Sequence, residues 1–380
     1  MYEHSLPITL ITGYLGAGKT TVLNHILHEK QGCRVAVIVN DIGEINIDAA
    51  LIEKGGAVTQ KEDNVVPLTN GCICCTLKED LVLQINELAK TGRFDAILIE
   101  ASGVCEPIPI AQTITLLNEA CKQKHLPSIC HLDNIVAVAD ALRLVKEFSC
   151  GKDFANTDWS QEDSEEEESI QNLLVQQLEF CSTVLINKAD LVTPDELRKI
   201  HAMVHALSPE AVILESSFGS VPVQELFNTH RFDFERVRLS AGWIHALEHP
   251  EEEEEPETLE YGIHTFVYDE RRPLNRERFQ AFLRRWPKEI IRSKGFLWFS
   301  DLPARAMLFE QASTQFTLTD NGPWIDALPA DEKAALFRQE PQLKQEWDER
   351  YGDRLVKLVF IGQNMNETAI RKELDDCLDN

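Results

Sequence analysis

A glycine-rich segment near the start of the chain has the residues and spacing of a phosphate-binding loop. Residues 13–20 read GYLGAGKT, which fits G-x-x-x-x-G-K-[ST], after an apolar run and before an expected helix. In such a loop the backbone N–H groups face the phosphates, Lys19 reaches the outer phosphates, and the Thr20 hydroxyl binds Mg2+. The predicted nucleotide contacts here are Gly13, Gly16, Ala17, Gly18, Lys19, Thr20 and Thr21.

A second motif, Asn187-Lys188-Ala-Asp190, directly follows the apolar run TVLIN. The Asp190 carboxylate can accept hydrogen bonds from both the ring N–H and the exocyclic amine of guanine. Adenine would present an unpaired acceptor there, and a buried mismatch of that kind is strongly rejected. The motif therefore predicts GTP as the nucleotide. Residues 216–217, two serines after the next expected strand, are a weaker candidate contact to the base.

Acidic residues follow two further apolar runs. Glu100 ends the run DAILIE, where its carboxylate can organise the water shell of Mg2+, and Gly103 follows as a flexible residue that can sense the γ-phosphate. Asp41 and Glu44 follow the run RVAVIVN and are candidates for metal or water contact. For both residues the competing interpretation is a polar loop that caps the next helix. The candidate catalytic residues are thus Lys19, Glu100 and Asp41.

Three cysteines lie together at Cys72, Cys74 and Cys75, after the run VVPL and before an expected helix over 76–90. A helix N-terminus lowers thiol pKa values and favours thiolates. Three thiolates suit Zn2+, which prefers four tetrahedral ligands, and Glu44 or water could be the fourth. A C-x-x-C redox pair and an inert buried cluster are the alternatives. The other seven cysteines are scattered, and we expect them to be ordinary core or surface residues.

Two histidine pairs have helical spacing, His201 with His205 and His245 with His249. Such a pair could bind metal, but a solvated helix face or a core position is the favoured interpretation of each.

The order of these motifs resembles that of the CobW-type GTPases, relatives of the nickel-inserting GTPases for urease and hydrogenase. The resemblance is carried by GYLGAGKTT, NDIGEINID, NGCICCTLKEDL, LIEASGVCEP and NKAD, and later by YGIHTFVYDERRPLNRERF, IIRSKGFLWF and LVFIG. It covers nearly the whole chain. Many relatives carry a histidine-rich stretch between their domains, whereas this chain has Glu251–Glu255 there.

The resemblance implies a GTP-hydrolysing zinc metallochaperone that uses Mg2+ and transfers Zn2+ to a client metalloprotein. A cobalt chaperone for cobalamin synthesis remains an alternative, because a three-thiolate site does not exclude Co2+. A non-catalytic GTP-dependent regulator is a further alternative, and homodimerisation is left open.

The segments that must position these motifs alternate between strand and helix. The expected strands are residues 7–12, 34–40, 65–68, 95–100, 135–139, 183–187 and 211–214. Such alternation predicts an α/β fold, a P-loop GTPase domain with a mostly parallel doubly wound sheet and helices on both faces. It also brings the phosphate loop and the cysteine loop to one edge of the sheet.

The chain then changes pattern after an acidic run. We expect a GTPase domain over 1–247 with an exposed acidic insertion near 151–168, a linker over 248–258, and a smaller α+β C-terminal domain over 259–380. The expected strands of the second domain are 261–268, 295–300 and 357–361, with helices over 275–286 and 367–378.

Composition limits the remaining functions. Lys and Arg number 37 and Asp and Glu 63, a formal charge of −26 over 380 residues, which disfavours nucleic acid and anionic membrane as partners. The chain has no run of about 18 apolar residues and no basic, signal-like start. We therefore expect a cytoplasmic protein with no membrane contact.

Overall fold

The computed structural model describes most of the chain in several stretches. These are residues 5–29, 33–39, 65–67, 78–103, 107–123, 128–148, 173–234, 237, 262–312, 315–339, 341–344 and 347–379. The chain divides into two compact units, Met1–Ala241 and Gly242–Asn380. This division precedes the expected linker at 248–258, which lies outside the described residues, as does the acidic insertion near 151–168.

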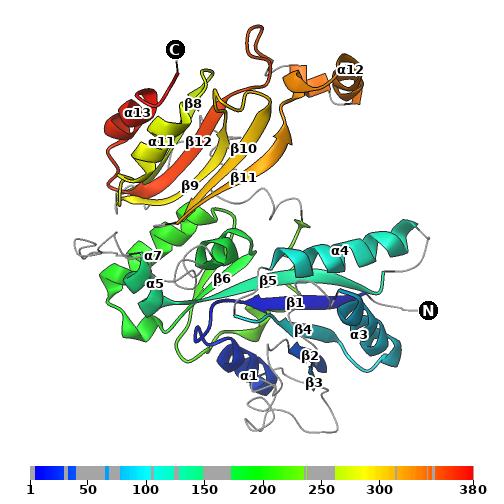
Figure 1. Ribbon diagram of the computed structural model, residues 1–380. Helices are drawn as coiled ribbons and strands as arrows, with labels where there is room; N and C mark the ends of the chain where they lie inside the picture. Colours follow the sequence, from blue (N-terminus) through cyan, green and yellow to red (C-terminus); the bar gives the residue numbers. More distant parts are fainter. Residues whose placement is uncertain are drawn as a thin grey trace. The chain divides into compact units, whose positions relative to one another are not determined.

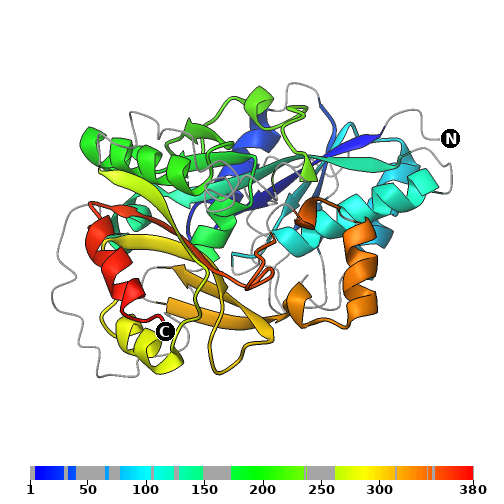
Figure 2. The ribbon, with the colours of Figure 1, turned by 90° about the horizontal axis from the view of Figure 1, so that it is seen from above.

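The first unit is built on a parallel sheet of seven described strands. The strands are β1 (Leu6–Thr12), β2 (Val35–Val39), β3 (Val65–Pro67), β4 (Ala96–Glu100), β5 (Cys130–Asp140), β6 (Thr183–Asn187) and β7 (Val212–Glu215). Their order in the sheet is β3-β2-β4-β1-β5-β6-β7, and each neighbouring pair is parallel. β1 and β5 run side by side in the middle of the sheet (Figure 1 and Figure 2).

Helices cover both faces of this sheet. They are α1 (Lys19–Glu29), α3 (Lys78–Thr91), α4 (Ile108–Gln123), α5 (Ala141–Glu147) and α7 (Pro194–Leu207). All five residues of β2 are buried, and so are all five of β4. Because successive side chains point to opposite faces, uninterrupted burial requires cover on both sides. On one face α1 inserts Val22, Leu23 and Ile26 against the central strands.

The α/β doubly wound fold expected from the apolar runs is confirmed for the first unit. The main difference is in β5, which begins five residues before the expected strand and spans eleven residues. Its first residues, 130–134, include His131, Asp133 and Asn134, and so lack the apolar pattern that reveals a buried strand.

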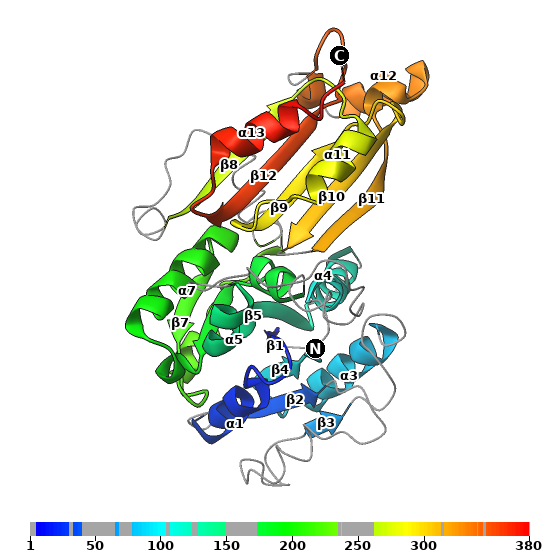
Figure 3. The same ribbon diagram turned by 60° about the vertical axis from the view of Figure 1, so that its left-hand side comes forward.

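The second unit is a five-stranded antiparallel sheet with helices. The strands are β8 (Ile263–Glu270), β9 (Ile290–Leu297), β10 (Arg305–Ala312), β11 (Gln315–Pro323) and β12 (Val356–Gln363), in the order β11-β10-β9-β12-β8. The helices are α11 (Arg276–Leu283), α12 (Ala330–Gln339) and α13 (Glu367–Asp375). α11 and α13 lie side by side over one face of this sheet (Figure 3).

The core of the second unit is aromatic. Phe279 and Phe282 of α11 pack with Phe309 of β10 and Phe360 of β12, and the rings of Phe279 and Phe309 meet edge to face with centroids 5.6 Å apart. The expected α+β class is confirmed, but two strands, β10 and β11, have no counterpart among the three expected. The expected strand over 295–300 is also wrong in its bounds, because the strand β9 ends at Leu297.

Candidate nucleotide-binding site

The glycine-rich loop connects β1 to α1 at the centre of the sheet. Gly13 and Gly18 have φ angles of +136° and +102°, values that a side chain rarely adopts. A Cβ on Gly13 would lie 2.2 Å from the carbonyl oxygen of Val138, and one on Gly18 would lie 2.3 Å from Nδ2 of Asn187. Both glycines are therefore required by close packing, against backbone at Gly13 and against a side chain at Gly18, as well as by conformation.

The loop delivers Lys19 and Thr20 to the start of α1. The Lys19 side chain is buried, and its Nζ donates to the carbonyl oxygen of Tyr14 within the loop over 3.4 Å. The Thr20 hydroxyl donates to Oε1 of Glu100 over 3.1 Å. Glu100, the last residue of β4, is buried. The structure thus brings together the three residues that the sequence suggested for phosphate and Mg2+ contact.

Gly103 lies beside the same loop. A Cβ built on Gly103 would lie 2.8 Å from the backbone nitrogen of Leu15 and 2.7 Å from Cδ2 of that residue. Only glycine lets the segment after β4 approach the phosphate loop so closely. Gly103 thus lies against the phosphate loop, and its role toward the γ-phosphate stays a prediction.

Asn187 joins three loops of the site. Its Nδ2 donates to the carbonyl oxygen of Ala17 over 2.9 Å. Its Oδ1 accepts from the hydroxyl of Ser216 over 3.2 Å and from the backbone N–H of Gly219 over 3.1 Å. Asn187 is buried, so these bonds are shielded from water. The asparagine therefore fixes the loops after β6 and β7 against the phosphate loop.

Lys188 makes a second connection to the phosphate loop. Its backbone has a φ of +61°, and its Nζ donates to the carbonyl oxygen of Gly16 over 2.9 Å and pairs with the carboxylate of Asp140 at 2.5 Å. Asp140 also caps α5 by accepting from the backbone N–H of Arg143. The sequence analysis missed Asp140, although its place after the apolar run IVAVA is the same signal that identified Glu100.

Asp190 is exposed at the end of this loop, with a carboxylate accessible to a base. The strand β7 leads to Ser216, whose carbonyl oxygen accepts from the N–H of Ala189, the residue before Asp190, over 3.1 Å. Two residues on, Phe218 has a φ of +55° and a ring that is 81% exposed. This exposed aromatic ring was not singled out from the sequence.

The metal and remaining catalytic candidates cannot be compared with the structure. Asp41, Glu44, Cys72, Cys74 and Cys75 all lie outside the described residues. The strands that lead to them are described. Val39, the last residue of β2, is level with Glu100 of β4 and with Pro67, the last residue of β3.

The described cysteines outside that cluster are core or near-core residues, as expected for those positions. Cys121, Cys130, Cys181 and Cys377 are buried, and Cys33 is half-buried. Burial raises the pKa of Cys130 and of Cys181 to about 12, so both stay protonated at neutral pH. His201, from one of the histidine pairs, contacts Glu215 at 2.9 Å, while His245 and His249 lie outside the described residues.

Comparison with protein families identifies the first unit. The CobW/HypB/UreG nucleotide-binding domain matches residues 7–215. The chain belongs to this family. The cobW C-terminal domain, named for a cobalamin synthesis protein, matches residues 263–378. The family expected from the motifs is confirmed, and the chain is a P-loop GTPase of the CobW/HypB/UreG family.

Relatives of this CobW-family chain carry zinc in their names. It is 38% identical to a zinc-regulated GTPase metalloprotein activator 1 of Dictyostelium discoideum, over 98% of this chain and 80% of that protein. It is 28% identical to the zinc chaperone YjiA of Escherichia coli, over 89% of this chain and 95% of that one. The crystal structure of Zn(II)-bound YjiA aligns over 99% of this chain and 100% of that chain with a TM-score of 0.44 and 20% identity.

None of the helices in the described ranges is both long and apolar enough to cross a bilayer.

Proposed function

We propose that the chain is a GTP-hydrolysing zinc metallochaperone that binds Zn2+ at Cys72, Cys74 and Cys75 and transfers it to client metalloproteins. The proposal that the chain binds GTP rests on one observation. Hydrogen bonds gather Lys19, Thr20, Glu100 and Asn187 around the phosphate loop. The zinc half is supported by the names of the relatives and by the chemistry of three neighbouring thiols.

The described residues fit Mg2+. The Thr20 hydroxyl and the Glu100 carboxylate are oxygen donors 3.1 Å apart, and oxygen is the ligand that Mg2+ prefers. Bound there, Mg2+ would neutralise charge on the β- and γ-phosphates. Thr20 would bind the ion directly, Glu100 would orient its water shell, and the backbone N–H groups of the loop with Lys19 would hold the phosphates. Asp190 and the loop of Ser216 would hold the guanine.

Strand register supports coupling between the two sites. Val39 and Glu100 are directly paired, and Val39 is paired in turn with Pro67. Neighbouring strands lie about 4.8 Å apart, so the segments that carry Asp41 and the cysteines start within roughly 10 Å of Glu100. A γ-phosphate and its metal order neighbouring loops of this kind, and hydrolysis releases them.

In the proposed cycle, Zn2+ is bound in the GTP state and released after hydrolysis. Mg2+·GTP pre-positions the thiols and tightens Zn2+ binding, and hydrolysis loosens the thiol cage so that the ion passes to a client. Linkage requires the converse, that Zn2+ tightens GTP binding by the same factor, typically about 5–150-fold.

The test is a Zn2+ competition titration with a non-hydrolysable GTP analogue, with GDP, and without nucleotide. We expect the analogue to give the tightest Zn2+ binding, and a Cys72/Cys74/Cys75→Ser variant to lose the dependence on nucleotide. Lys19→Ala is the control for nucleotide binding, since it removes a cation from the phosphate site.

Equal Zn2+ affinity in all three nucleotide states would reject the coupled mechanism. A preference for Co2+ over Zn2+ in the same titration would favour the cobalt alternative. Negligible GTP turnover with metal and client present would favour the regulator.

A further inference from the structure

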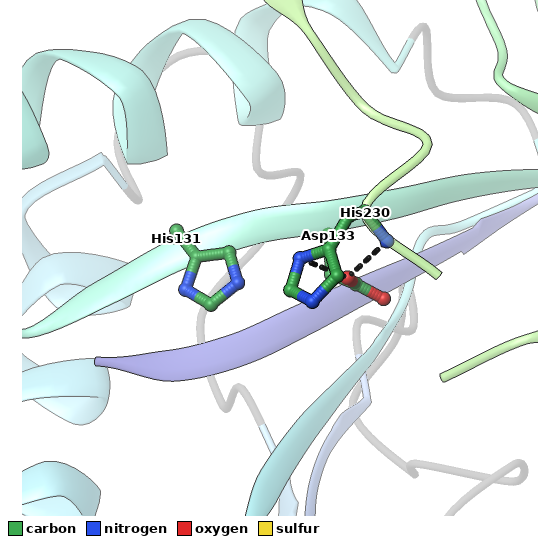
Figure 4. A group of neighbouring side chains, drawn as sticks. All are labelled: His131, Asp133 and His230. Carbon is green, nitrogen blue, oxygen red and sulfur yellow. Dashed lines mark hydrogen bonds and ion pairs between the residues drawn. The ribbon is translucent and has the colours of Figure 1, made fainter. Parts of the chain in front are cut away.

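A cluster of metal-ligating side chains lies in the first unit, away from the nucleotide. His131 and Asp133 come from β5, and His230 comes from the segment after β7, about a hundred positions later in the sequence. One ligand atom from each of the three side chains lies within 4.8 Å of the others. Figure 4 shows a ring nitrogen of His131 facing His230, whose own ring nitrogen is paired with Asp133.

From these contacts we propose that His131, Asp133 and His230 form a binding site for Zn2+ or a similar borderline divalent cation. Two imidazoles and a carboxylate suit Zn2+ and Co2+ better than Mg2+ or Ca2+, which prefer all-oxygen sites. Three protein ligands leave a fourth tetrahedral position for water, as in sites whose metal remains accessible. The proposal goes beyond the chaperone function, and it does not depend on the three cysteines.

The carboxylate is held in place by the chain around it. Asp133 is buried, and its Oδ2 accepts from the N–H of Thr229 over 3.0 Å, while its Oδ1 accepts from the N–H of His230 over 2.8 Å. A carboxylate has about four lone-pair sites, so Oδ1 keeps acceptor capacity toward a cation. A register shift between β1 and β5 places Asp133 as an extra residue in β5, since Ile8 pairs with Leu132 and Thr9 with Asn134. Such bulges re-aim side chains at functional positions.

The first imidazole is oriented by a chain of hydroxyl groups. Nδ1 of His131 is 3.0 Å from the Ser5 hydroxyl, which donates its own proton to Ser128 over 3.3 Å. The Ser128 hydroxyl in turn donates to Oδ1 of Asn118, and the carbonyl oxygen of Cys130 lies 2.9 Å from it. With its proton committed to Ser128, the Ser5 oxygen accepts from Nδ1–H of His131. This tautomer leaves Nε2 with a free lone pair, the arrangement that outer-shell hydrogen bonds give to zinc-binding histidines.

The second imidazole can complete the site. The His230 side chain is 75% exposed, and its Nδ1 lies 3.6 Å from Oδ1 of Asp133. The rings of His131 and His230 stack with centroids 6.1 Å apart. Ligand atoms on a tetrahedral zinc ion are about 3.3 Å apart, given bonds of 2.0–2.1 Å. A shift of about 1.5 Å is therefore needed, and the exposed ring is free to make it. The neighbouring cation, Arg231, is directed to Glu225 and so does not oppose a metal ion.

The site is separate from the nucleotide site. Asp133 lies near the amino end of β5, whereas Asp140, which binds Lys188, ends the same strand. Seven residues of strand span roughly 23 Å. The proposed metal site is therefore at the opposite edge of the sheet from the phosphate loop.

The experiment isolates this site by using the full chain with Cys72/Cys74/Cys75→Ser. Zn2+ binding is measured by competition with a chromophoric chelator, and Co2+ is added as a spectroscopic probe. We expect one equivalent of metal to remain, with cobalt bands of nitrogen and oxygen ligation and no thiolate charge-transfer band. Adding His230→Asn should weaken the affinity by more than the roughly 10–100-fold that loss of an outer-shell partner costs.

His230→Asn is chosen because asparagine tolerates the +51° φ of this residue and keeps the N–H that Asp133 accepts. His131→Ala should give the same loss, with metal-free thermal unfolding used to confirm the fold of each variant. His201→Ala is the matched control, because His201 also contacts a carboxylate but comes from α7. Absence of a bound equivalent in the triple-serine protein would overturn the proposal. So would metal binding that survives both substitutions, or that falls equally in the His201→Ala control.

Discussion

The carboxylate of Asp190 is the single side chain on which base selectivity should depend. Asp190→Asn replaces two acceptor contacts to guanine with an amide that can donate to a xanthine carbonyl. We expect GTP affinity to fall at least about 100-fold, because each unsatisfied buried polar group costs about 1–3 kcal/mol. Xanthosine triphosphate should bind better to this variant than to the wild type.

Equilibrium titration with fluorescent GTP and xanthosine triphosphate analogues measures both effects. Asp195→Asn, an exposed position in the first turn of α7, is the control for a general loss of surface charge. Unchanged GTP affinity in Asp190→Asn would show that the NKAD segment does not read the base.

Among single residues, those that lie in short contiguous motifs could be predicted from the sequence. Lys19, Thr20 and Asn187 lie in contiguous patterns with fixed spacing, and the structure brings them together as expected. His131 and His230 carry no such signal, because their approach depends on how β5 and the segment after β7 pack. Asp140 was also missed, since a lone aspartate after a strand is common and its partner Lys188 is 48 residues away.

At the scale of the elements, the position of the loop after β6 depends on the side-chain amide of Asn187. Asn187→Ala would remove three hydrogen bonds. They join the loop after β6 to the phosphate loop at Ala17 and to the loop after β7 at Ser216 and Gly219. We expect a loss of about 2–4 kcal/mol in the stability of the first unit, at about 1 kcal/mol a bond plus the cost of unsatisfied partners. GTP affinity should fall even though Asp190 is intact.

Chemical denaturation and GTP titration of the variant test this prediction. Asn86→Ala is a suitable control, because its side chain donates only to the backbone of its own helix. A stability equal to that of the wild type would show that the three loops are held by other contacts.

In the second unit, two neighbouring strands share a partly buried ion cluster. Glu310 of β10 contacts Lys294 at 2.5 Å and the fully buried Arg292 at 3.5 Å. Burial alone would raise the pKa of Glu310, but the two cations outweigh it, and the net pKa is lowered. A carboxyl group with a lowered folded-state pKa stabilises the fold at neutral pH and loses that contribution as pH falls below its unfolded pKa.

Glu310→Gln should therefore destabilise the second unit by about 2–3 kcal/mol at pH 7, somewhat less than the 3–5 kcal/mol for breaking a fully buried pair. The difference from wild type should shrink between about pH 5 and pH 3, as the wild-type carboxyl becomes protonated. Denaturation midpoints across this range, with the exposed Glu349→Gln as control, provide the measurement. A difference that stays constant with pH would contradict the role given to the Glu310 charge.

Whether a strand could be predicted from the sequence depends on how much of it is buried. β1, β2, β4 and β6 are buried along almost their whole length, so their sequences are mostly apolar. β10 contains Arg305, Glu310 and Gln311, and β11 carries mostly polar residues as an edge strand. Their side chains alternate irregularly, because ion pairs replace apolar contacts on one face, and the period-2 signal is lost.

At the scale of the whole molecule, two hydrophobic clusters among the described residues, one in each unit, share no residue. One cluster draws on residues between Ile11 and Phe227, and the other on residues between Phe266 and Leu378. We therefore expect two transitions in calorimetric unfolding of the full chain. A GTP analogue with Mg2+ at 100 times its Kd should stabilise the first unit by about 2.7 kcal/mol.

For a unit of this size, that energy corresponds to a rise of about 5–10 °C in one transition. The other transition should not move. ATP at the same concentration is the control for non-specific nucleotide effects. A single transition, or an equal shift of both, would show that the two units unfold cooperatively.

The strand order has a consequence for synthesis on the ribosome. β1 precedes the other described strands in the chain, but its neighbours in the sheet are β4, which ends at Glu100, and β5, which ends at Asp140. At about 5–20 residues per second, translation of the 128 residues from Thr12 to Asp140 takes roughly 6–26 s. During that interval β1 has no neighbouring strand until β4 is made, and even then its edge toward β5 stays unpaired. Nascent chains arrested before residue 140 should therefore remain protease-sensitive and recruit holdase chaperones, whereas chains long enough to expose β5 should begin to resist cleavage.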